Sequence, residues 1–429
     1  MKQAFILFSI LFLFFSATAA TLRDTLPYGV NLAGAEFGQT NMPGVYQTDY
    51  TYPTGAEVNY FASKGLGLIR LPFRWERVQH QLNGPLDTTE LLRIGSFLDT
   101  CAAKNMQVIL DMHNYGAYRM NDSNYKIGTT LVPQSSFVDV WVKLATYFKN
   151  KTNIYGYDIM NQPLDLGYYV WILAAQEVLY AIRDIDKSKN IIVEGEKYSL
   201  TECWEQCNDI LRKIYDPSNK LIYEAHIFFD KDGVGNYPQY SFDSIGADVE
   251  AGVRRAKPFV EWLKKNNKRG MIGSYGIPDT DSRWLSLMDN FLQYLSANCV
   301  NATYWAAGPW WKNYALSVEP DSTGADKMQM QVLQKYPYTP CDTPKGSYQV
   351  IPQIYFYPNP VRSLLTIDQG NCNNYQSAEV IDAVGRRVYT GTITGNKNVI
   401  NLSTLPPGVW IIILRAADGS RYTQKIVKQ

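Results

Sequence analysis

The pattern of hydrophobic and polar positions divides the chain into two parts. Between Tyr28 and about Tyr336, eight short apolar runs alternate with segments of helical period. We expect helices at residues 88–105, 136–149, 168–184 and 247–266, the first with Asp87 and Glu90 at capping-box spacing. The eight apolar runs, which we expect to form strands, are residues 28–35, 68–73, 107–112, 154–160, 191–196, 221–226, 270–274 and 303–307.

Eight strand–helix units over roughly three hundred residues predict an α/β fold, a (β/α)₈ TIM barrel. In that fold the working side chains come from the carboxyl ends of the strands and from the loops that follow. Polar and aromatic residues gather at these points of the sequence: Arg70, His113, Asn161, Gln162, His226, Ser274 and Trp305.

The pattern changes after the barrel segment. Residues 336–353 are rich in Pro, Thr and Ser and are predicted to be a linker. Residues 354–429 contain short apolar runs, several with period two, separated by glycines, which predicts a small C-terminal β-sandwich. The strands expected there are residues 364–367, 379–381, 388–393, 399–402, 409–414 and 422–427.

Residues 1–20 have the composition of a signal peptide. Lys2 provides the positive start, residues 5–15 are almost wholly apolar, and residues 17–20 (ATAA) form a small-residue cleavage site. The apolar run is too short to span a bilayer, and no later stretch qualifies. We therefore expect an exported protein with no membrane span, whose barrel domain covers residues 21–335.

The net charge and the cysteine content limit which partners and bound groups we expect. The 41 basic and 40 acidic residues give a net charge of +1, which gives no reason to expect nucleic acid or an anionic membrane as a partner. Cys203 and Cys207 are close enough to pair, and Cys101 falls on the apolar side of a helix, as expected for a buried thiol. The cysteine spacings are not those of a zinc site, so we expect neither a metal nor a cofactor.

Five segments of the barrel resemble glycoside hydrolase family 5, whose best-known members are endoglucanases. They are residues 29–38 (GVNLAGAEFG), 70–76 (RLPFRWE), 110–115 (LDMHNY), 159–163 (IMNQP) and 304–311 (YWAAGPWW). They occur in the family's order, and the resemblance runs along the whole barrel. It implies a cleft that binds a polysaccharide through Arg70, His113, Tyr115, Asn161, His226, Trp305, Trp310 and Trp311.

The resemblance also implies two catalytic glutamates, at the ends of strands four and seven, and both positions differ here. Gln162 stands at the acid/base position, and Ser274 stands at the nucleophile position within residues 272–276 (IGSYG). An amide has no proton to give, and a serine hydroxyl needs an adjacent base before it can attack. Phe228 and Leu164 also stand where the family usually has polar side chains. We therefore expect the barrel to bind β-1,4-glucan or a related polysaccharide without hydrolysing it, as a pseudo-glycosidase.

Three alternatives stay open. The chain could be an active endo-β-glucanase with relocated carboxylates, of which Glu196 is the best single candidate. It could be a surface interaction protein without a sugar ligand, if Lys312 and the loops around Asp122 or Asp232 occlude the cleft. It could also be a deliberately inactivated sequence, although the changes at Leu164 and Phe228 look more like drift.

The C-terminal part resembles the sorting domain of the type IX secretion route. The matching motifs are residues 357–360 (YPNP), 385–386 (GR), 405–408 (LPPG) and 425–428 (KIVK). The resemblance implies the type IX secretion machinery as a partner, transport across an outer membrane, and either release or retention at the cell surface. A carbohydrate-binding sandwich competes less well, because Trp410 is the only tryptophan in the module.

Overall fold

The computed structural model of the protein describes most of the chain. It covers residues 24–233, 235, 237, 241–243, 248–311, 313–341, 354–357, 359–369, 375–417 and 419–429. The predicted signal peptide, Lys312 and most of the predicted linker lie outside the described residues.

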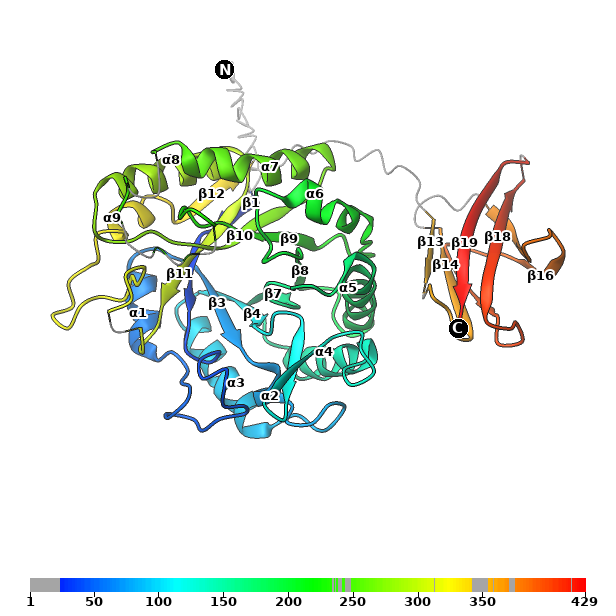
Figure 1. The fold of residues 1–429 in the computed structure, drawn as a ribbon, viewed down its shortest axis with the longest axis horizontal. Helices are drawn as coiled ribbons and strands as arrows, with labels where there is room; N and C mark the ends of the chain where they lie inside the picture. Colours follow the sequence, from blue (N-terminus) through cyan, green and yellow to red (C-terminus); the bar gives the residue numbers. More distant parts are fainter. Residues whose placement is uncertain are drawn as a thin grey trace, which may run out of the picture.

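Eight parallel strands close into a barrel, which confirms the predicted fold (Figure 1). Strands β3, β4 and β9 have the predicted bounds, and the other five differ from the prediction by a few residues at one or both ends. The barrel strands in chain order are β2 (Gly29–Leu32), β3 (Leu68–Phe73), β4 (Gln107–Met112), β7 (Ile154–Asp158), β8 (Asn190–Glu194), β9 (Leu221–His226), β10 (Gly270–Tyr275) and β11 (Asn301–Ala307).

Helices surround the barrel (Figure 1). Thr54 and Glu57 form a complete capping box at α1, but the capping box predicted at Asp87 is wrong in its second half. Asp87 accepts a bond from the Glu90 backbone, whereas the Glu90 carboxylate turns inward. The longer helices are α1 (Gly55–Ser63), α3 (Thr88–Ala102), α4 (Gln134–Phe148), α5 (Tyr168–Arg183), α7 (Ala251–Lys265) and α8 (Arg283–Ala297); the short ones are α2 (Trp75–Val78), α6 (Trp204–Asn208), η1 (Asp209–Lys213) and α9 (Met330–Leu333).

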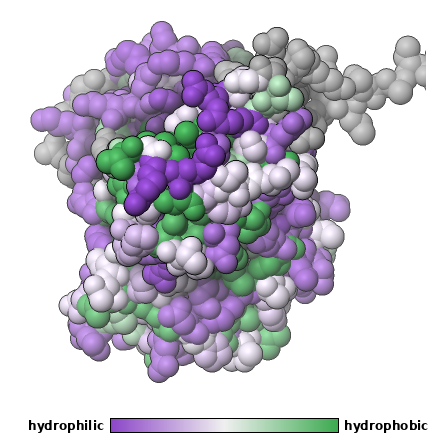
Figure 2. Space-filling model, turned by 90° about the vertical axis from the view of Figure 1, so that its right-hand side faces the viewer, coloured by the Kyte–Doolittle hydropathy of each residue, from purple (hydrophilic) through white to green (hydrophobic). Residues whose placement is uncertain are grey.

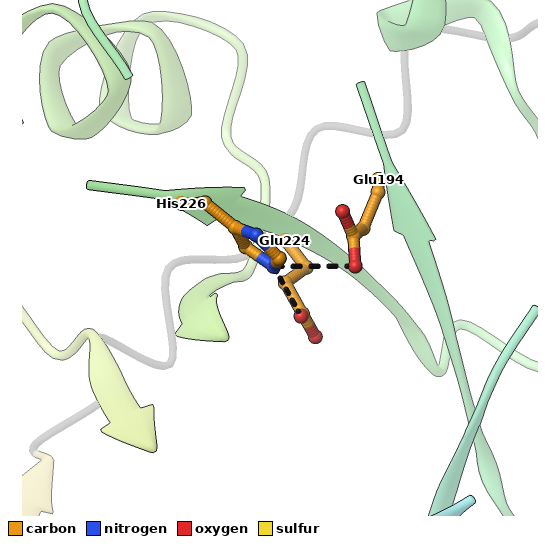
Figure 3. Close-up of side chains that lie close together, drawn as sticks. All are labelled: Glu194, Glu224 and His226. Atoms are coloured by element: carbon orange, nitrogen blue, oxygen red, sulfur yellow. Dashed lines mark hydrogen bonds and ion pairs between the residues drawn. The ribbon is translucent and has the colours of Figure 1, made fainter. Parts of the chain in front are cut away.

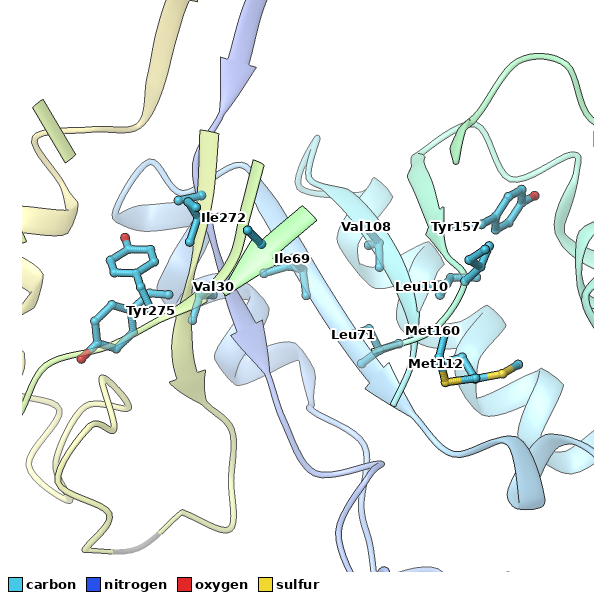
Figure 4. Close-up of a cluster of buried hydrophobic side chains, with 14 of the residues drawn as sticks. Val30, Ile69, Leu71, Val108, Leu110, Met112, Tyr157, Met160, Ile272 and Tyr275 are labelled. Carbon is cyan, nitrogen blue, oxygen red and sulfur yellow. The ribbon is translucent and has the colours of Figure 1, made fainter. Parts of the chain in front are cut away.

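Period-two alternation along the strands sorts the barrel core into an outer and an inner set. Outward residues, with Ile69 and Leu71 of β3 as examples, pack between the strands and the helices (Figure 4). Inward residues form layers within the barrel, because side chains of alternate strands meet at the same height. One inner layer is an apolar floor made of Leu68, Ile109, Tyr155, Ile192, Ile222 and Met271.

Two additional sheets flank the barrel. β1 (Asp24–Pro27) pairs antiparallel with β12 (Tyr338–Cys341), so the start of the segment predicted as a linker is a strand. β5 (Ala117–Met120) and β6 (Ser123–Lys126) form a hairpin after β4 that the hydrophobic pattern did not predict. This hairpin rises beside the strand ends where the functional residues were expected.

The C-terminal part folds into two antiparallel sheets, of order β13-β14-β17 and β16-β15-β18-β19. The two sheets enclose a separate apolar core that includes Trp410. On the side of the molecule that carries this module, hydrophobic residues gather next to strongly hydrophilic ones (Figure 2). Its strands are β13 (Tyr355–Tyr357), β14 (Leu364–Asp368), β15 (Tyr375–Ile381), β16 (Arg387–Thr392), β17 (Lys397–Asn401), β18 (Gly408–Ala416) and β19 (Arg421–Lys428).

The cysteines follow the two expectations that concern described residues. Cys203 and Cys207 form a disulfide with a Cα–Cα distance of 5.4 Å. Cys101 is a buried free thiol on α3. Within the described part of the chain, each helix is too short or too polar to cross a bilayer.

Candidate active site

Arg70 lies at the centre of the barrel, above the apolar floor. Its side chain is fully buried, and it contacts one carboxylate from each of four successive strands. Its nitrogens lie 2.8 Å from Asp111, 2.6 Å from Asp158, 2.8 Å from Glu194 and 3.0 Å from Glu224. The network ties β3 to β4, β7, β8 and β9, and it occupies the donors of Arg70.

Four carboxyls facing one arginine leave negative charge uncompensated. Burial, followed by the charge of Glu224, raises the pKa of Glu194 well above its ordinary value. The same two causes raise the pKa of Asp158. Burial opposes the charge of Arg70, but the surrounding carboxylates outweigh it and raise the Arg70 pKa. The cluster therefore holds a proton at pH values where free carboxyls have lost theirs.

Two histidines stand above this layer, each held by a carboxylate. His113 Nδ1 lies 2.7 Å from Asp111 Oδ2, and His226 Nε2 lies 3.1 Å from Glu224 Oε1. Each carboxylate favours the proton on the ring nitrogen that faces it. Burial lowers the pKa of His113, so its ring is neutral, and its Nε2 lies 3.2 Å from the Tyr115 hydroxyl. Both rings therefore have a fixed orientation.

Gln162 follows β7 and adopts a left-handed backbone with φ of 44°. Its backbone N–H donates to Glu194 Oε2 at 2.8 Å. Its side-chain Nε2 lies 2.8 Å from His226 Nδ1. Because the other nitrogen of His226 faces Glu224, Nδ1 is the acceptor and the amide donates. A carboxylic acid in this place would donate only while protonated.

Ser274 comes from β10, at a point where the strand is irregular. The register shifts between Ile272 and Ser274 against β9, so the residue at this β-bulge is turned out of the regular alternation. A Cβ on Gly273 would lie 1.6 Å from Glu224 Oε1, which explains the glycine. Ser274 itself is buried and pairs in register with His226. Gln162 and Ser274 thus both adjoin His226.

Three of the predicted aromatic residues join one cluster at this end of the barrel. The Trp305 ring stacks on His113 with a centroid distance of 5.5 Å, and its edge meets Trp311 at 5.8 Å. Tyr314 covers one face of Trp311 at 4.4 Å. Tyr115 joins the same group edge-on to His113. Trp310 is half-buried and makes no ring contact with another described residue.

Two further carboxyls lie in the loops beyond the strands. Burial raises the pKa of Glu36 to about 7, and one of its oxygens accepts from the Gly34 backbone at 2.7 Å. Its other oxygen is buried and has no hydrogen-bond partner among the described residues. Burial also raises the pKa of Glu196, whose contacts are with Asn208 and with backbone of the loop after β7. Among the described residues, Glu196 makes no contact with Gln162, Ser274 or His226.

Glu194, Glu224 and His226 have the composition of a metal site (Figure 3). One ligand atom from each lies within 4.8 Å of the others. However, Arg70 binds both carboxylates directly, and His226 Nε2 faces them at 3.3 and 3.1 Å. A divalent cation would compete with a guanidinium for the same oxygens. We therefore describe this cluster as an ion-pair network.

The structure brings most of the predicted residues together but changes the place of some. Arg70 lies below the cleft, so the sugar contact expected of it is not available in this structure. Asn161 accepts from Arg70 Nη2 at 3.0 Å, and its buried Nδ2 has no partner among the described residues. Sequence reasoning did not identify Glu194, because it favoured Glu196, two residues further along. The only signal was a second carboxylate in the same strand end.

The barrel has relatives among known proteins. Residues 30–310 match the family described as Cellulase (glycosyl hydrolase family 5). The probable endo-beta-1,4-glucanase B of Aspergillus oryzae is 30% identical over 313 residues, covering 72% of this chain and 89% of that protein. The endoglucanase Cel5A of Pseudomonas stutzeri, solved in complex with cellobiose, is 42% identical with a TM-score of 0.70, over 74% of this chain and 93% of that one. XacCel5A, solved in complex with cellopentaose, is 36% identical with a TM-score of 0.68, over 72% of this chain and 99% of that one.

The C-terminal module has its own match. Residues 355–429 match the secretion system C-terminal sorting domain. This domain indicates export by the type IX route to the cell surface or to the outside, as the sequence predicted. Since the cellulase match spans most of the barrel and the related structures share its fold, the chain belongs to glycosyl hydrolase family 5.

Proposed function

We propose that the chain binds β-1,4-glucan or a related polysaccharide outside the cell without hydrolysing it. The observation that carries the proposal is the chemistry of two strand ends. Gln162 presents an amide, and Ser274 presents a hydroxyl, at the positions where the family has its two glutamates. The endoglucanase names of the related proteins support a β-glucan as the ligand. The residues at the two strand ends support the absence of hydrolysis.

Retaining hydrolysis needs an acid for the leaving oxygen and a carboxylate, about 5–5.5 Å away, that attacks the anomeric carbon. The Gln162 amide donates a hydrogen bond to His226 but cannot release its proton to a sugar oxygen. General acid help alone is worth ~10²–10⁴-fold, and covalent catalysis adds to it. Loss of both groups lowers the rate towards that of the uncatalysed reaction, even if the cleft still binds.

Features that support binding do not depend on those two groups. Trp305 and Trp311 keep partly exposed rings at the strand ends, and flat aromatic faces are apolar platforms for sugars. His113 and Tyr115 add neutral polar groups beside them. Two related endoglucanases have been solved with cellobiose and with cellopentaose. We infer that this chain accepts a β-1,4-linked glucan in the corresponding place.

Binding and turnover test the two halves of the proposal separately. Purified full-length protein should bind cellopentaose in a calorimetric titration and should be retained on insoluble cellulose. The same preparation should release no reducing ends above the level of a matched preparation without the protein. Absence of affinity for every β-glucan would remove the binding half. Release of oligosaccharides at an ordinary enzymatic rate would remove the other half.

A second candidate function is hydrolysis by relocated carboxylates. The observation in its favour is Glu36, which is buried, has a pKa of about 7 and has an unpartnered oxygen. A group with that pKa can exchange protons at neutral pH. Glu196, the candidate from the sequence, lies in the loop after β8. If the unmodified protein releases products, comparing Glu36→Gln with Glu196→Gln would identify which group is needed.

A further inference from the structure

A cavity of about 410 Å³ opens beside the candidate site. Its wall is formed by the β5–β6 hairpin and by residues that follow β3 and β7. It adjoins the site directly, because Arg74 donates to the His113 backbone oxygen and Tyr115 donates to the Asn161 backbone oxygen. The residues of the wall that matter here are Arg74, Glu76, Tyr115, Arg119, Lys126 and Leu164.

The cavity wall carries more positive than negative charge. Arg74, Arg119 and Lys126 line it, and Glu76 is the one carboxylate among the described lining residues. Glu76 is already satisfied, because Asn114 Nδ2 lies 3.0 and 2.9 Å from its two oxygens and the Arg119 backbone donates at 2.6 Å. Three cations therefore line the cavity together with one carboxylate among the described lining residues, and that carboxylate also lies 3.9 Å from Arg74.

The cations keep donors that no described residue uses. Arg74 is 4% exposed, its Nε has no hydrogen-bond partner, and Glu76 Oε2 lies 3.9 Å from that nitrogen. Lys126 donates to the Leu164 backbone oxygen, which leaves two of its three donors. Burial lowers the pKa of Lys126 from its ordinary value, so an anion bound beside it would favour its charged form.

The acidic groups around the cavity neutralise these cations only in part, through the 3.9 Å ion pair between Arg74 and the buried Glu76. Asp122 lies 3.3 Å from Arg119, but its side chain is 93% exposed, so the pair is weak. Asp165 pairs with Lys197. Asp165 and, to a smaller extent, Glu196 also act on Lys126 through space and favour its charged form. With Arg74 paired to Glu76, the two partly buried cations Arg119 and Lys126 still give the cavity wall an excess of positive charge. Such an excess is unusual for a site that binds only neutral sugar, because uncompensated charge costs desolvation energy.

We propose that this cavity is a subsite for an acidic sugar unit, so that the ligand is a β-linked glycan bearing carboxylate or sulfate groups. The inference rests on the proposed function, since the neighbouring cleft must first hold the backbone of the glycan. Guanidinium groups bind carboxylate and sulfate oxygens in a bidentate manner, and Lys126 adds a point charge. A neutral glucan would bring no negative charge to these cations.

The test compares ligands that share one backbone. Cellohexaose, its C6-oxidised counterpart of β-1,4-linked glucuronic acid, and a 6-sulfated cello-oligosaccharide are titrated calorimetrically into the full-length protein. We expect at least one acidic ligand to bind about tenfold more tightly than cellohexaose at low salt. The preference should shrink at high salt, since partly exposed ion pairs are screened. The two acidic ligands distinguish a carboxylate from a sulfate.

Variants test whether the preference for acidic ligands arises in this cavity. The double variant Arg119→Gln/Lys126→Gln should lose the preference and keep its affinity for cellohexaose. The matched double variant Lys104→Gln/Arg212→Gln, at exposed positions outside the cavity, should keep both. Equal binding of all ligands overturns the acidic subsite and leaves the proposed function standing. A preference that persists in Arg119→Gln/Lys126→Gln also overturns it, and failure of every ligand to bind overturns the proposed function.

Discussion

Two levels of the barrel interior, one directly above the other, differ in charge and in burial. The lower level is Arg70 with its four carboxylates, all fully buried and within hydrogen-bonding distance. The upper level holds the neutral side chains of Gln162 and Ser274. The lower level is charged and fully buried, whereas in the upper level Gln162 is partly exposed and Ser274 is buried. Under the proposed function, the comparison teaches that a charged network can persist for structural reasons below a level that carries no charge.

The energetics of burial explain the contrast. Removing one partner from a buried ion network leaves the others uncompensated, so each member is held in place by the stability of the fold. Under the proposed function, neutral Gln162 and Ser274 stand in place of charged groups, and such a change lowers the cost of desolvation rather than raising it. The stability of the fold therefore requires Arg70, whereas it does not require carboxylates at positions 162 and 274.

Restoring both glutamates should have the largest effect on this comparison. In Gln162→Glu/Ser274→Glu the new carboxyls stand above an intact network, and His226 remains beside the first of them. We expect endoglucanase turnover to rise by about 10⁴-fold or more above the background of the unmodified chain. Release of reducing ends from carboxymethyl cellulose measures it.

The single changes serve as controls for this experiment. Gln162→Glu alone supplies an acid without a nucleophile, and Ser274→Glu alone supplies a nucleophile without an acid. Each should give far less turnover than the pair. If the double variant folds, binds glucan and still does not turn over, the upper level has changed in more than two side chains.

Removing the central cation tests the lower level. Arg70→Met should destabilise the barrel by about 3–5 kcal/mol, because it leaves buried carboxylates without their partner. Nine of the ten tryptophans lie outside the C-terminal module, so tryptophan fluorescence in a urea titration follows the barrel. Arg283→Met, which breaks an exposed pair with Asp243 and Asp281, should change the midpoint little. Similar midpoints for both variants would contradict the role given to the network.

Stability should fall as pH rises, and Glu36 should account for part of the fall. The folded-state pKa of Glu36 is about 7 against an ordinary value of 4.5, so the folded chain holds this proton more tightly than the unfolded chain. Between those pH values stability therefore decreases with pH, by up to about 3 kcal/mol for this group. Glu36→Gln should flatten the pH dependence and raise the urea midpoint above pH 7. Some slope should remain, because burial also raises the pKa of Glu319 to about 7.

The smallest expected effect concerns the aromatic platform. Trp305→Ala should weaken cellopentaose binding by up to about tenfold, because it removes the partly exposed aromatic platform that stacks on His113. The control is Trp410→Phe, in the core of the C-terminal module, which should leave binding unchanged. Equal losses from both changes would show that the first acts through overall folding.

The sequence predicted much of the fold because its signals are local. The apolar runs at β3, β4 and β9 coincide with the observed strands. The β1–β12 pair was not predicted, because neither Asp24–Pro27 nor Tyr338–Cys341 shows a period of its own and their partners are more than three hundred residues apart. Glu90 was assigned to a capping box, but tertiary contacts with the Tyr50 and Tyr52 hydroxyls take its carboxylate.

The candidate site was predicted less completely, because depth in a barrel is not a local property. Motifs identified Arg70 and His226, yet they could not tell that Arg70 lies beneath the cleft. Glu194 and Glu196 are two residues apart, and only the end of β8 decides which one points into the network. The cavity beside the β5–β6 hairpin has no sequence motif, because Arg74 follows β3 whereas Arg119 and Lys126 come from the hairpin.

The pairing of β1 with β12 has a consequence for how the barrel can be handled as a unit. Because Asp24 lies opposite Cys341, the first and last strands of the catalytic-type segment emerge side by side. A domain whose two ends lie side by side can be inserted into a loop of another protein. It can also be circularly permuted, with only a short linker between the original ends. The barrel can therefore be exchanged as a unit: another domain whose two ends lie close together could replace it ahead of the same sorting module.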